Sequence, residues 1–413
     1  MTQTEASAIE KIVGGSSCPV AHITWEGPER PAMAGYEMLD GLQAESPIHR
    51  VEEGMGFYLI TGHEAALMVA QNPTEFPQGS RILSTGEPSP FLLVPHGLNG
   101  PVHQKWRRVL APFFTPGQVA ALDGKVRARA IELIEELQAR GECDYTSEFA
   151  LRFPTAVFLE LMGLPLDELD MMLEWETNIL HPDYSEGGAG VAAMHQAQQQ
   201  VTEYFMTLIS ERRAMPRADR PAGLATEALD WAIDGEPVSD ADLLSFYLLF
   251  FMAGLDTVTA ELGYGFRHLA THPEHRQRLV EEPEIIPKAA EELLRAYSIV
   301  NTMRDVAEDT EVAGCPVAKG DLVVVSFPAA GRDEDTYPNA KEVDFDRPVI
   351  NHLAFGAGPH RCLGSHLARH ELVVAYEEWH KRIPEYSLDE DAQQLEASGG
   401  MMTLNTLPLK WTP

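Results

Sequence analysis

The sequence predicts a mainly α-helical fold with a small β-rich region. Long segments compatible with a helix dominate the chain, while extended segments are few and short. The longest helical segment, Asp240 to Ala270, is strongly apolar between Leu243 and Leu255. The 413 residues would allow two domains by length alone, but single large domains exist, and we expect one domain over residues 1–413.

The helical and extended segments can be placed along the chain. A further helix is expected to start near Pro101, because proline is favoured at the first helical position. About the first 15 residues have no apolar period, and we expect them to be loose. The other expected helices are Val119 to Arg140, Ser147 to Met162, Gln198 to Arg213, Asp240 to Ala270, Ile286 to Tyr297 and Leu363 to Trp379. The expected extended segments are Gly56 to Thr61, Glu311 to Val317 and Asp321 to Ser326.

Net charge and cysteine usage exclude several classes of protein. A net charge of −32 argues against binding to nucleic acid or to an anionic membrane surface. No apolar run reaches the roughly 20 residues that span a bilayer, and no signal peptide is visible, so we expect a cytoplasmic protein. Cys18, Cys143 and Cys315 are scattered and are expected to be free thiols in a reducing compartment.

The fourth cysteine, Cys362, ends a glycine-rich loop just before a helical segment. Gly356 and Gly358 allow the backbone to turn sharply and to approach a bound group closely. Amides near a helix start favour the charged form of a thiol. A random intracellular cysteine is more often a small buried hydrophobe. The flanking Phe355 and His360 favour instead a cysteine that acts as a ligand or a nucleophile.

This loop resembles the haem-binding loop of the cytochromes P-450, whose pattern is Phe-x-x-Gly-x-x-x-Cys-x-Gly. Phe355, Gly358, Cys362 and Gly364 match its four fixed positions. The resemblance implies a triangular helical prism with a long central oxygen-binding helix and a small β-rich region. It also implies haem b as cofactor, with Cys362 as the ligand of its iron.

Two further motifs of that family have counterparts here. Asp256 and Thr257, in Ala253-Gly254-Leu255-Asp256-Thr257, resemble the oxygen-binding segment of the family. A buried carboxylate must be paired or functional, so Asp256 is expected to relay protons and Thr257 to hold bound dioxygen. Glu292 and Arg295 match a Glu-x-x-Arg pair that is structural in the family. Arg347 looks like the arginine that completes it.

Four cationic positions match the family's partners of the haem propionates. His103 and Arg107 are four residues apart on an expected helix, so both can face one anion. His360 and Arg304 match two further propionate partners. Each residue alone would be read as a solvated surface cation, but arginine suits carboxylates because its donors form a planar fork.

These motifs together predict a monooxygenase that inserts one atom of dioxygen into a C–H bond. A peroxide-driven peroxygenase or a haem sensor is the alternative, but neither needs the acid–threonine pair. No flavin or Fe–S motif is present, so electrons must come from another protein. The resemblance implies NADH, a ferredoxin reductase and a [2Fe–2S] ferredoxin, which Lys105, Arg107, Arg108 and Arg361 would attract.

The resemblance extends to the camphor 5-monooxygenase subgroup, through segments such as Cys362-Leu363-Gly364-Ser365-His366-Leu367-Ala368-Arg369. Its members have a tyrosine that holds the substrate ketone, where this chain has Phe91. His96 could replace that donor, although a surface histidine in a loop is the favoured reading. The substrate pocket is expected to contain Phe91, Leu93, Leu249, Met252, Ala253, Val300 and Met401.

This apolar pocket favours a small terpenoid or norisoprenoid such as an ionone, with camphor or another monoterpene as the alternative. Relatives also carry an arginine where this chain has His181. If His181 pairs with Asp256, proton delivery depends on pH near neutrality. Relatives are mostly monomers, and we expect a monomer here.

Overall fold

The computed structural model describes residues 18–25, 29–52, 54, 56–79, 93–181, 189–389 and 391–413. The expectation that about the first 15 residues are loose lies outside these ranges. The α-helices are α2 (Ala34–Glu45), α3 (His63–Gln71), α4 (Gly100–Leu110), α5 (Pro116–Gln138), α6 (Arg152–Met162), α7 (Leu169–Leu180), α8 (Ala189–Ala214), α9 (Leu224–Glu227), α10 (Asp240–Thr271), α11 (Pro273–Glu281), α12 (Ile286–Ala296), α13 (Phe327–Ala330) and α14 (Ser365–Arg382).

The strands are short and form several small sheets. They are β1 (Val20–Ala21), β2 (Arg30–Pro31), β3 (Ile48–Val51), β4 (Phe57–Ile60), β5 (Glu142–Asp144), β6 (Ala232–Ile233), β7 (Glu236–Pro237), β8 (Asn301–Asp305), β9 (Thr310–Val312), β10 (Cys315–Val317), β11 (Leu322–Ser326), β12 (Ser387–Leu388), β13 (Leu395–Ala397), β14 (Thr403–Leu404) and β15 (Pro408–Lys410). The largest sheet has the order β1-β3-β4-β11-β8 and mixes parallel and antiparallel pairs. The fold is therefore mainly helical with a small β-rich region, as the sequence predicts.

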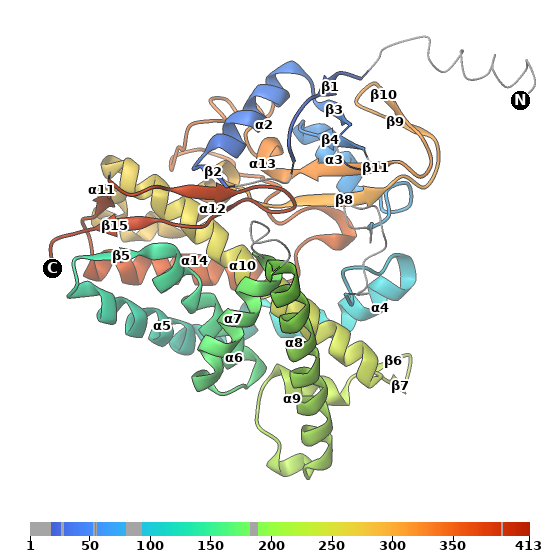
Figure 1. Ribbon diagram of the computed structural model, residues 1–413, viewed down its shortest axis with the longest axis vertical. Coiled ribbons are helices and arrows are strands. Elements are labelled where there is room, and N and C mark those ends of the chain that lie inside the picture. The colour runs from blue at the N-terminus through green and yellow to red at the C-terminus, as the bar shows by residue number, and fades with distance from the viewer. Residues whose placement is uncertain are drawn as a thin grey trace, which may run out of the picture.

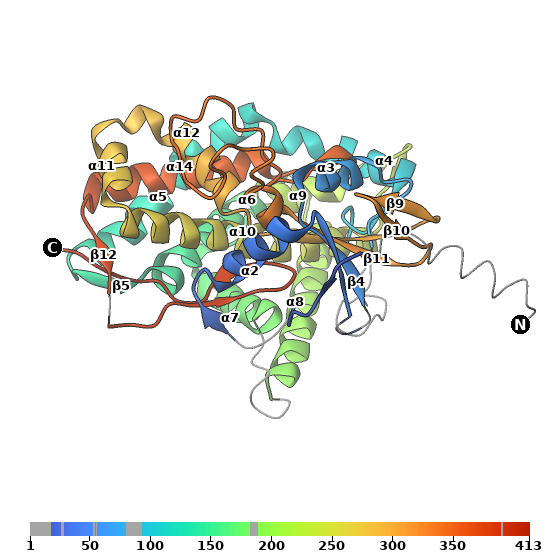
Figure 2. The same cartoon turned by 90° about the horizontal axis from the view of Figure 1, so that it is seen from above.

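Helix α10 runs through the middle of the molecule in both views (Figures 1 and 2) and contacts α6, α7, α8, α11, α12 and α14. Ser239 caps its start by accepting a hydrogen bond from the Asp242 amide, and Asp240 and Asp242 favour the positive end of the helix dipole. Buried side chains cover nearly all of the helix after Leu255. It therefore forms the core against which several of the other helices pack.

The expected helices are found, with shifted ends. Helix α8 begins nine residues before Gln198, because the alanine-rich segment of residues 189–197 has high helix propensity. Helix α14 begins at Ser365, since Gly364 is its N-cap, and Cys362 therefore stays in the loop. The segment from Ser147 starts as a π-turn over Thr146–Ala150 before α6.

Helix α10 corrects one expectation about membranes. Among the described residues, it is the one helix that is long and apolar enough to span a bilayer, with a mean hydropathy of 1.6 over its most apolar stretch. Half of that stretch is buried inside the fold, and the core helix of a water-soluble domain meets the same criteria. Length and composition alone therefore do not distinguish a central helix from a spanning one.

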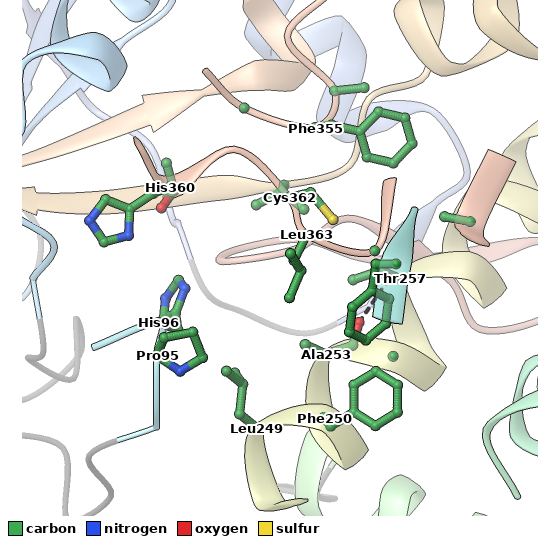
Figure 3. A pocket seen from close by; sticks show the side chains of 18 of the residues that line it. Pro95, His96, Leu249, Phe250, Ala253, Thr257, Phe355, His360, Cys362 and Leu363 are labelled. Atoms are coloured by element: carbon green, nitrogen blue, oxygen red, sulfur yellow. Dashed lines mark hydrogen bonds between the residues drawn. The ribbon is translucent and has the colours of Figure 1, made fainter. Parts of the chain in front are cut away.

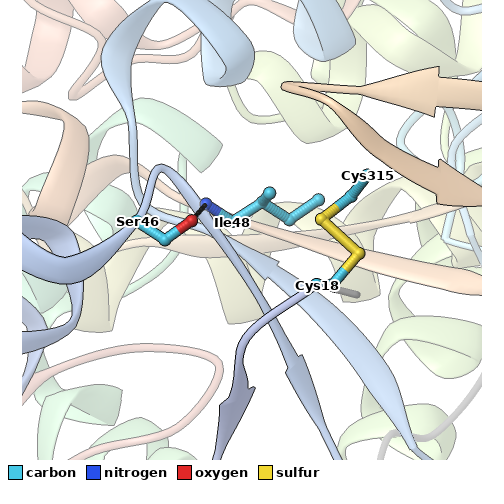
Figure 4. The surroundings of a disulfide bond; sticks show 4 residues. All are labelled: Cys18, Ser46, Ile48 and Cys315. Atoms are coloured by element: carbon cyan, nitrogen blue, oxygen red, sulfur yellow. Dashed lines mark hydrogen bonds between the residues drawn. A yellow bond between two sulfur atoms is a disulfide. The ribbon is translucent and has the colours of Figure 1, made fainter. Parts of the chain in front are cut away.

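The expectation of three free thiols outside the loop is wrong for two of them. Cys18 and Cys315 form a disulfide between the segment before β1 and the start of β10 (Figure 4). Their Cα atoms are 5.5 Å apart although 297 residues separate them in the sequence, so only the tertiary fold brings them together. Cys143 is free and buried, as expected.

Candidate functional site

The loop that carries Cys362 is held tightly against its surroundings. Gly356 and Gly358 have φ of +66° and +67°, which side chains rarely adopt. A Cβ atom on Gly358 would lie 2.5 Å from the Ala70 carbonyl oxygen, so only glycine fits there. The Cys362 amide donates to the Phe355 carbonyl at 2.8 Å. This arrangement presents the thiol at the N-terminal end of α14, where it opens onto a cavity (Figure 3).

The surroundings of Cys362 act on the pKa of its thiol in opposite directions. Burial raises the pKa of the thiol, whereas the Gly364 amide and the charges of Arg107, Arg361 and Arg369 act to lower it. Without a further positive charge, the thiol stays protonated at neutral pH. Metal binding requires the thiolate, so a bound metal ion would supply the missing charge. Cys362 thus has the properties of a metal ligand whose thiolate form is stabilised when a metal ion binds.

Helix α10 forms one wall of the cavity. The lining residues repeat at helical spacing on one face: Phe246, Leu249, Phe250, Ala253, Gly254, Thr257, Val258 and Glu261. The Thr257 hydroxyl donates to the Ala253 carbonyl at 3.0 Å. The Ala253 carbonyl thus accepts a side-chain bond next to Gly254, which has no side chain to fill the cavity. The small residues Ala253 and Gly254 therefore leave room above Cys362.

Asp256 is buried behind this wall, with an exposed fraction of 2%. Its Oδ2 atom lies 3.1 Å from His181 Nε2, at the end of α7. Burial tends to lower the pKa of His181, but the hydrogen bond and the charge of Asp256 outweigh burial and raise it. The Oδ1 atom of Asp256 has no hydrogen-bond partner among the described residues. The structure thus brings Asp256 next to Thr257 and His181, as the sequence suggests.

The opposite end of the cavity is cationic. His103 and Arg107 of α4, Arg304 of β8 and His360 of the loop all line it, and the His103 and His360 rings stack at 4.1 Å. Burial lowers the pKa of Arg304 to about 10, and burial with the nearby His103 and Arg304 lowers that of His360 to about 3.

No carboxylate of the described residues forms an ion pair with Arg107 or Arg304. Buried cations without a counter-charge require an anion, and guanidinium groups match carboxylates. With the thiol at one wall and these cations at the end, the residues fit a planar cofactor that carries both a metal and carboxylates.

The cavity has a volume of about 330 Å³, and some of the residues expected in the substrate pocket line it. Leu249, Ala253 and Val300 line it, as predicted. Phe91 lies outside the described residues. Leu93, Met252 and Met401 are described but are not part of the wall.

Local contacts explain why each of these three residues lies outside the cavity wall. Met252 precedes Ala253 by one position, so the helix turns it toward the core cluster around Phe251. Met401 pairs by its backbone with Val300, and its side chain packs on another core cluster. Leu93 lies at the edge of the described segment, where its carbonyl accepts from the Gly97 amide.

Sequence reasoning also missed several wall residues. His96 is an exposed residue of the turn at Val94–Gly97, and its ring lines the cavity beside Pro95 (Figure 3). The helical period of α10 could have identified Phe246, Phe250 and Glu261. No local signal identifies residues that come from other elements, which are Gln78, Leu110, Phe114, Leu294 and Ile299.

The three residues that were predicted to be structural, Glu292, Arg295 and Arg347, lie away from this cavity. Glu292 and Arg295 of α12 are fully buried, and Arg347 joins them from the segment before Pro348. None of the three lines the cavity. Phe355 and Gly364 do line it, on the side of Cys362.

Comparisons with known proteins agree with this geometry. A family model described as Cytochrome P450 matches residues 190–379. A probable cytochrome P450 127A1 of Sinorhizobium fredii is 31% identical, over 87% of this chain and 84% of that relative. A linalool 8-monooxygenase of Pseudomonas putida is 27% identical, over 90% and 95%. The crystal structure of cytochrome P450 CYP101C1 has a TM-score of 0.85 at 26% identity, covering 96% of this chain and 97% of that one.

Proposed function

The chain belongs to the cytochrome P450 family, and on that premise we propose that it oxidises a small apolar terpenoid or norisoprenoid of the ionone type. As a member, it is a haem-thiolate monooxygenase with haem b as cofactor. The observation that carries the proposal is the position of Cys362 in a largely apolar cavity with a cationic end.

Different residues of this chain would bind the cofactor, transfer protons and position dioxygen. Cys362 would hold the iron of haem b, and a thiolate ligand of this kind favours O–O cleavage when the cofactor is bound. Arg304, His360, His103 and Arg107 would hold the cofactor carboxylates. The His181 ring, about a quarter exposed, takes a proton from solvent and passes it from Nε2 to Asp256 Oδ2. Thr257 lines the cavity beside Ala253, where its hydroxyl would hydrogen-bond dioxygen.

The substrate class rests on the wall of the cavity. Leu249, Phe250 and Phe114 give it an apolar surface, and Ala253 and Val300 are small. Among the relatives, the linalool 8-monooxygenase acts on a terpenoid by its name. Phe91 would offer no hydrogen-bond donor to a camphor ketone, so camphor would lack the contact that holds it in the subgroup that this chain resembles.

Electrons would come from NADH through a reductase and a [2Fe–2S] ferredoxin. Arg108 and Arg361 are exposed, whereas Lys105 already pairs with Asp234 and Arg107 faces the cavity. We therefore expect Arg108→Glu to slow reduction by an acidic ferredoxin more than Lys105→Glu does. Stopped-flow reduction at several salt concentrations measures both. Equal rates in both variants and the wild type would place docking elsewhere.

We also propose a monomeric, single-domain protein of the cytoplasm. The acidic charge and the relatives support this location. The Cys18–Cys315 disulfide is the observation against it, because structural disulfides are rare in reducing compartments. Thiol titration of protein that is alkylated inside intact cells decides between bonded and free cysteines.

The experiment that tests the substrate class is a spin-state titration of the ferric protein with camphor and β-ionone. A substrate that displaces water from iron shifts the Soret band to its high-spin position. We expect a large shift with β-ionone and little with camphor. A strong shift with camphor and none with β-ionone would contradict the proposed class and favour a monoterpene hydroxylase.

A further inference from the structure

Glu176 is a buried acid to which the mechanism above gives no role. It lies on α7 and is fully buried, and neither of its carboxyl oxygens has a hydrogen-bond partner within the part of the chain that the structure describes. A buried polar atom without a partner is costly, so the position of this carboxyl group needs an explanation beyond packing. Helix α7 packs against α10, which carries Asp256.

The Glu176 carboxyl group holds a proton at neutral pH. Burial, and then the negative charge of Asp256, raise the pKa of Glu176 well above its usual range. A protonated carboxyl group has one O–H donor, which needs an acceptor when it is buried. Thr155 is the other polar side chain that acts on Glu176. Its hydroxyl already donates to the Leu151 carbonyl at 2.7 Å, so its own hydrogen is not available to Glu176.

Asp256 offers the acceptor that matches this donor. His181 Nε2 lies 3.1 Å from Asp256 Oδ2, while Oδ1 has no partner among the described residues. A bond to an ionised oxygen is stronger than a bond to a neutral hydroxyl, so Oδ1 is a better acceptor than Thr155 for the O–H group. The two carboxyl groups are not bonded directly, but their unpaired oxygens number about as many as a buried water molecule bonds.

We propose that Glu176 is a positioning residue of the proton relay, and that its acid group donates to Asp256 Oδ1 through one bound water molecule. Helix α7 then supplies a donor to each oxygen of Asp256, since His181 directly follows the last residue of that helix. Two donors hold the carboxylate in one orientation and keep it charged until it accepts a proton from His181. Glu176 keeps its own proton throughout. The inference rests on the relay of the proposed function and deepens it.

Infrared spectroscopy of the ferric holoprotein tests the hydrogen bond without turnover. The carbonyl stretch of a protonated carboxylic acid is separate from the amide bands, and its frequency depends on the bond that the acid donates. The difference spectrum between the wild type and Glu176→Gln at neutral pH should contain this band. The same difference in an Asp256→Asn background should show the band at a shifted frequency, because an amide is a weaker acceptor than a carboxylate. Asp240→Asn, at the exposed start of α10, is the control background and should not move it.

Two infrared results would overturn the inference. If the difference spectrum contains no such band, Glu176 is ionised and has no proton to donate. If the band is present but Asp256→Asn does not move it, the proton is donated to Thr155 and Glu176 has only a structural role. Failure of β-ionone as a substrate leaves the infrared result standing, so the substrate class and this inference fail separately.

Turnover with the redox partners tests the positioning role. Glu176→Leu removes the donor, and the loss of a hydrogen bond to a charged group should lower turnover about tenfold or more, with little change in substrate affinity in the spin-state titration. Glu176→Gln keeps an N–H donor and should rescue most of that loss. Equal losses in both variants overturn the inference, because Glu176 must then give up its proton. Unchanged turnover in Glu176→Leu also overturns it. If Glu176→Leu does not fold, Glu176→Gln and the infrared comparison decide.

Discussion

Two buried clusters of charged side chains differ in how completely their hydrogen bonds are satisfied. In the first, both oxygens of Glu292 accept bonds from both Arg295 and Arg347, at 2.6–3.1 Å. The remaining N–H groups of the two arginines donate to backbone carbonyls between Gly331 and Glu342. This cluster ties α12 to the segment after α13.

The second cluster contains Asp256, His181 and Glu176. Asp256 Oδ1 and both carboxyl oxygens of Glu176 have no hydrogen-bond partner among the described residues, although Glu176 is fully buried. Burial, and then the charge of Asp256, raise the pKa of Glu176 well above its usual range. A buried polar atom without a partner is costly. The contrast teaches that complete pairing marks a structural tie, while incomplete pairing is what we expect where protons must move.

The largest effect should come from breaking the satisfied cluster. Glu292→Ala leaves two buried guanidinium groups without a counter-charge, so we expect a loss of about 3–5 kcal/mol in the free energy of unfolding. Urea unfolding measures it. Arg278→Ala, which removes an exposed ion pair with Asp346, is the control and should change stability little. If both variants lost the same small amount, the first cluster would not be a structural tie.

The second effect is on catalysis. Asp256→Asn removes the carboxylate that passes protons, and we expect turnover to fall by about 10²-fold with little change in substrate affinity. Turnover is measured with the redox partners, and affinity by the spin-state titration. Asp240→Asn, at the exposed start of the same helix, is the matched control. Unchanged turnover in Asp256→Asn would remove the proton relay from the mechanism.

The third effect is a pH dependence that His181 introduces. Its pKa is raised above 6.5, so the ion pair with Asp256 is complete below that pH and is lost as the pH rises through the raised value. We expect turnover to decline over the same range, approaching tenfold per pH unit. His181→Arg keeps the positive charge at every pH and should flatten the profile. A flat profile in the wild type would show that His181 does not supply the proton.

The smallest effect concerns the stability cost of the second cluster. With its pKa raised in the folded state, Glu176 keeps a proton that the unfolded chain releases above about pH 4.5, so stability falls as the pH rises from there. Glu176→Gln removes this dependence and should stabilise the protein by about 1 kcal/mol at neutral pH. Urea unfolding at acidic and neutral pH tests it. The same pH dependence in both proteins would mean that Glu176 is ionised in the folded state.

The sequence was most informative where function depends on short-range geometry. The loop at Cys362 and the Asp256–Thr257 pair are local patterns, because a glycine turn before a helix and two neighbours on a helix need no distant contact. The pocket was harder to predict. Leu249 and Val300 line the cavity, whereas Met252 and Met401 pack on core clusters.

By itself, the sequence determined the mainly helical fold and the family, because both depend on residue type and local spacing. It also predicted the cysteine ligand, the oxygen-helix pair and the four propionate partners from the same kind of local pattern. Only the tertiary structure decided that His96 faces the cavity, that α7 brings Glu176 near Asp256, and that Cys18 bonds to Cys315. These contacts join segments that are far apart in the chain or lack periodicity. Their geometry is set by the packing of whole elements, which no local pattern encodes.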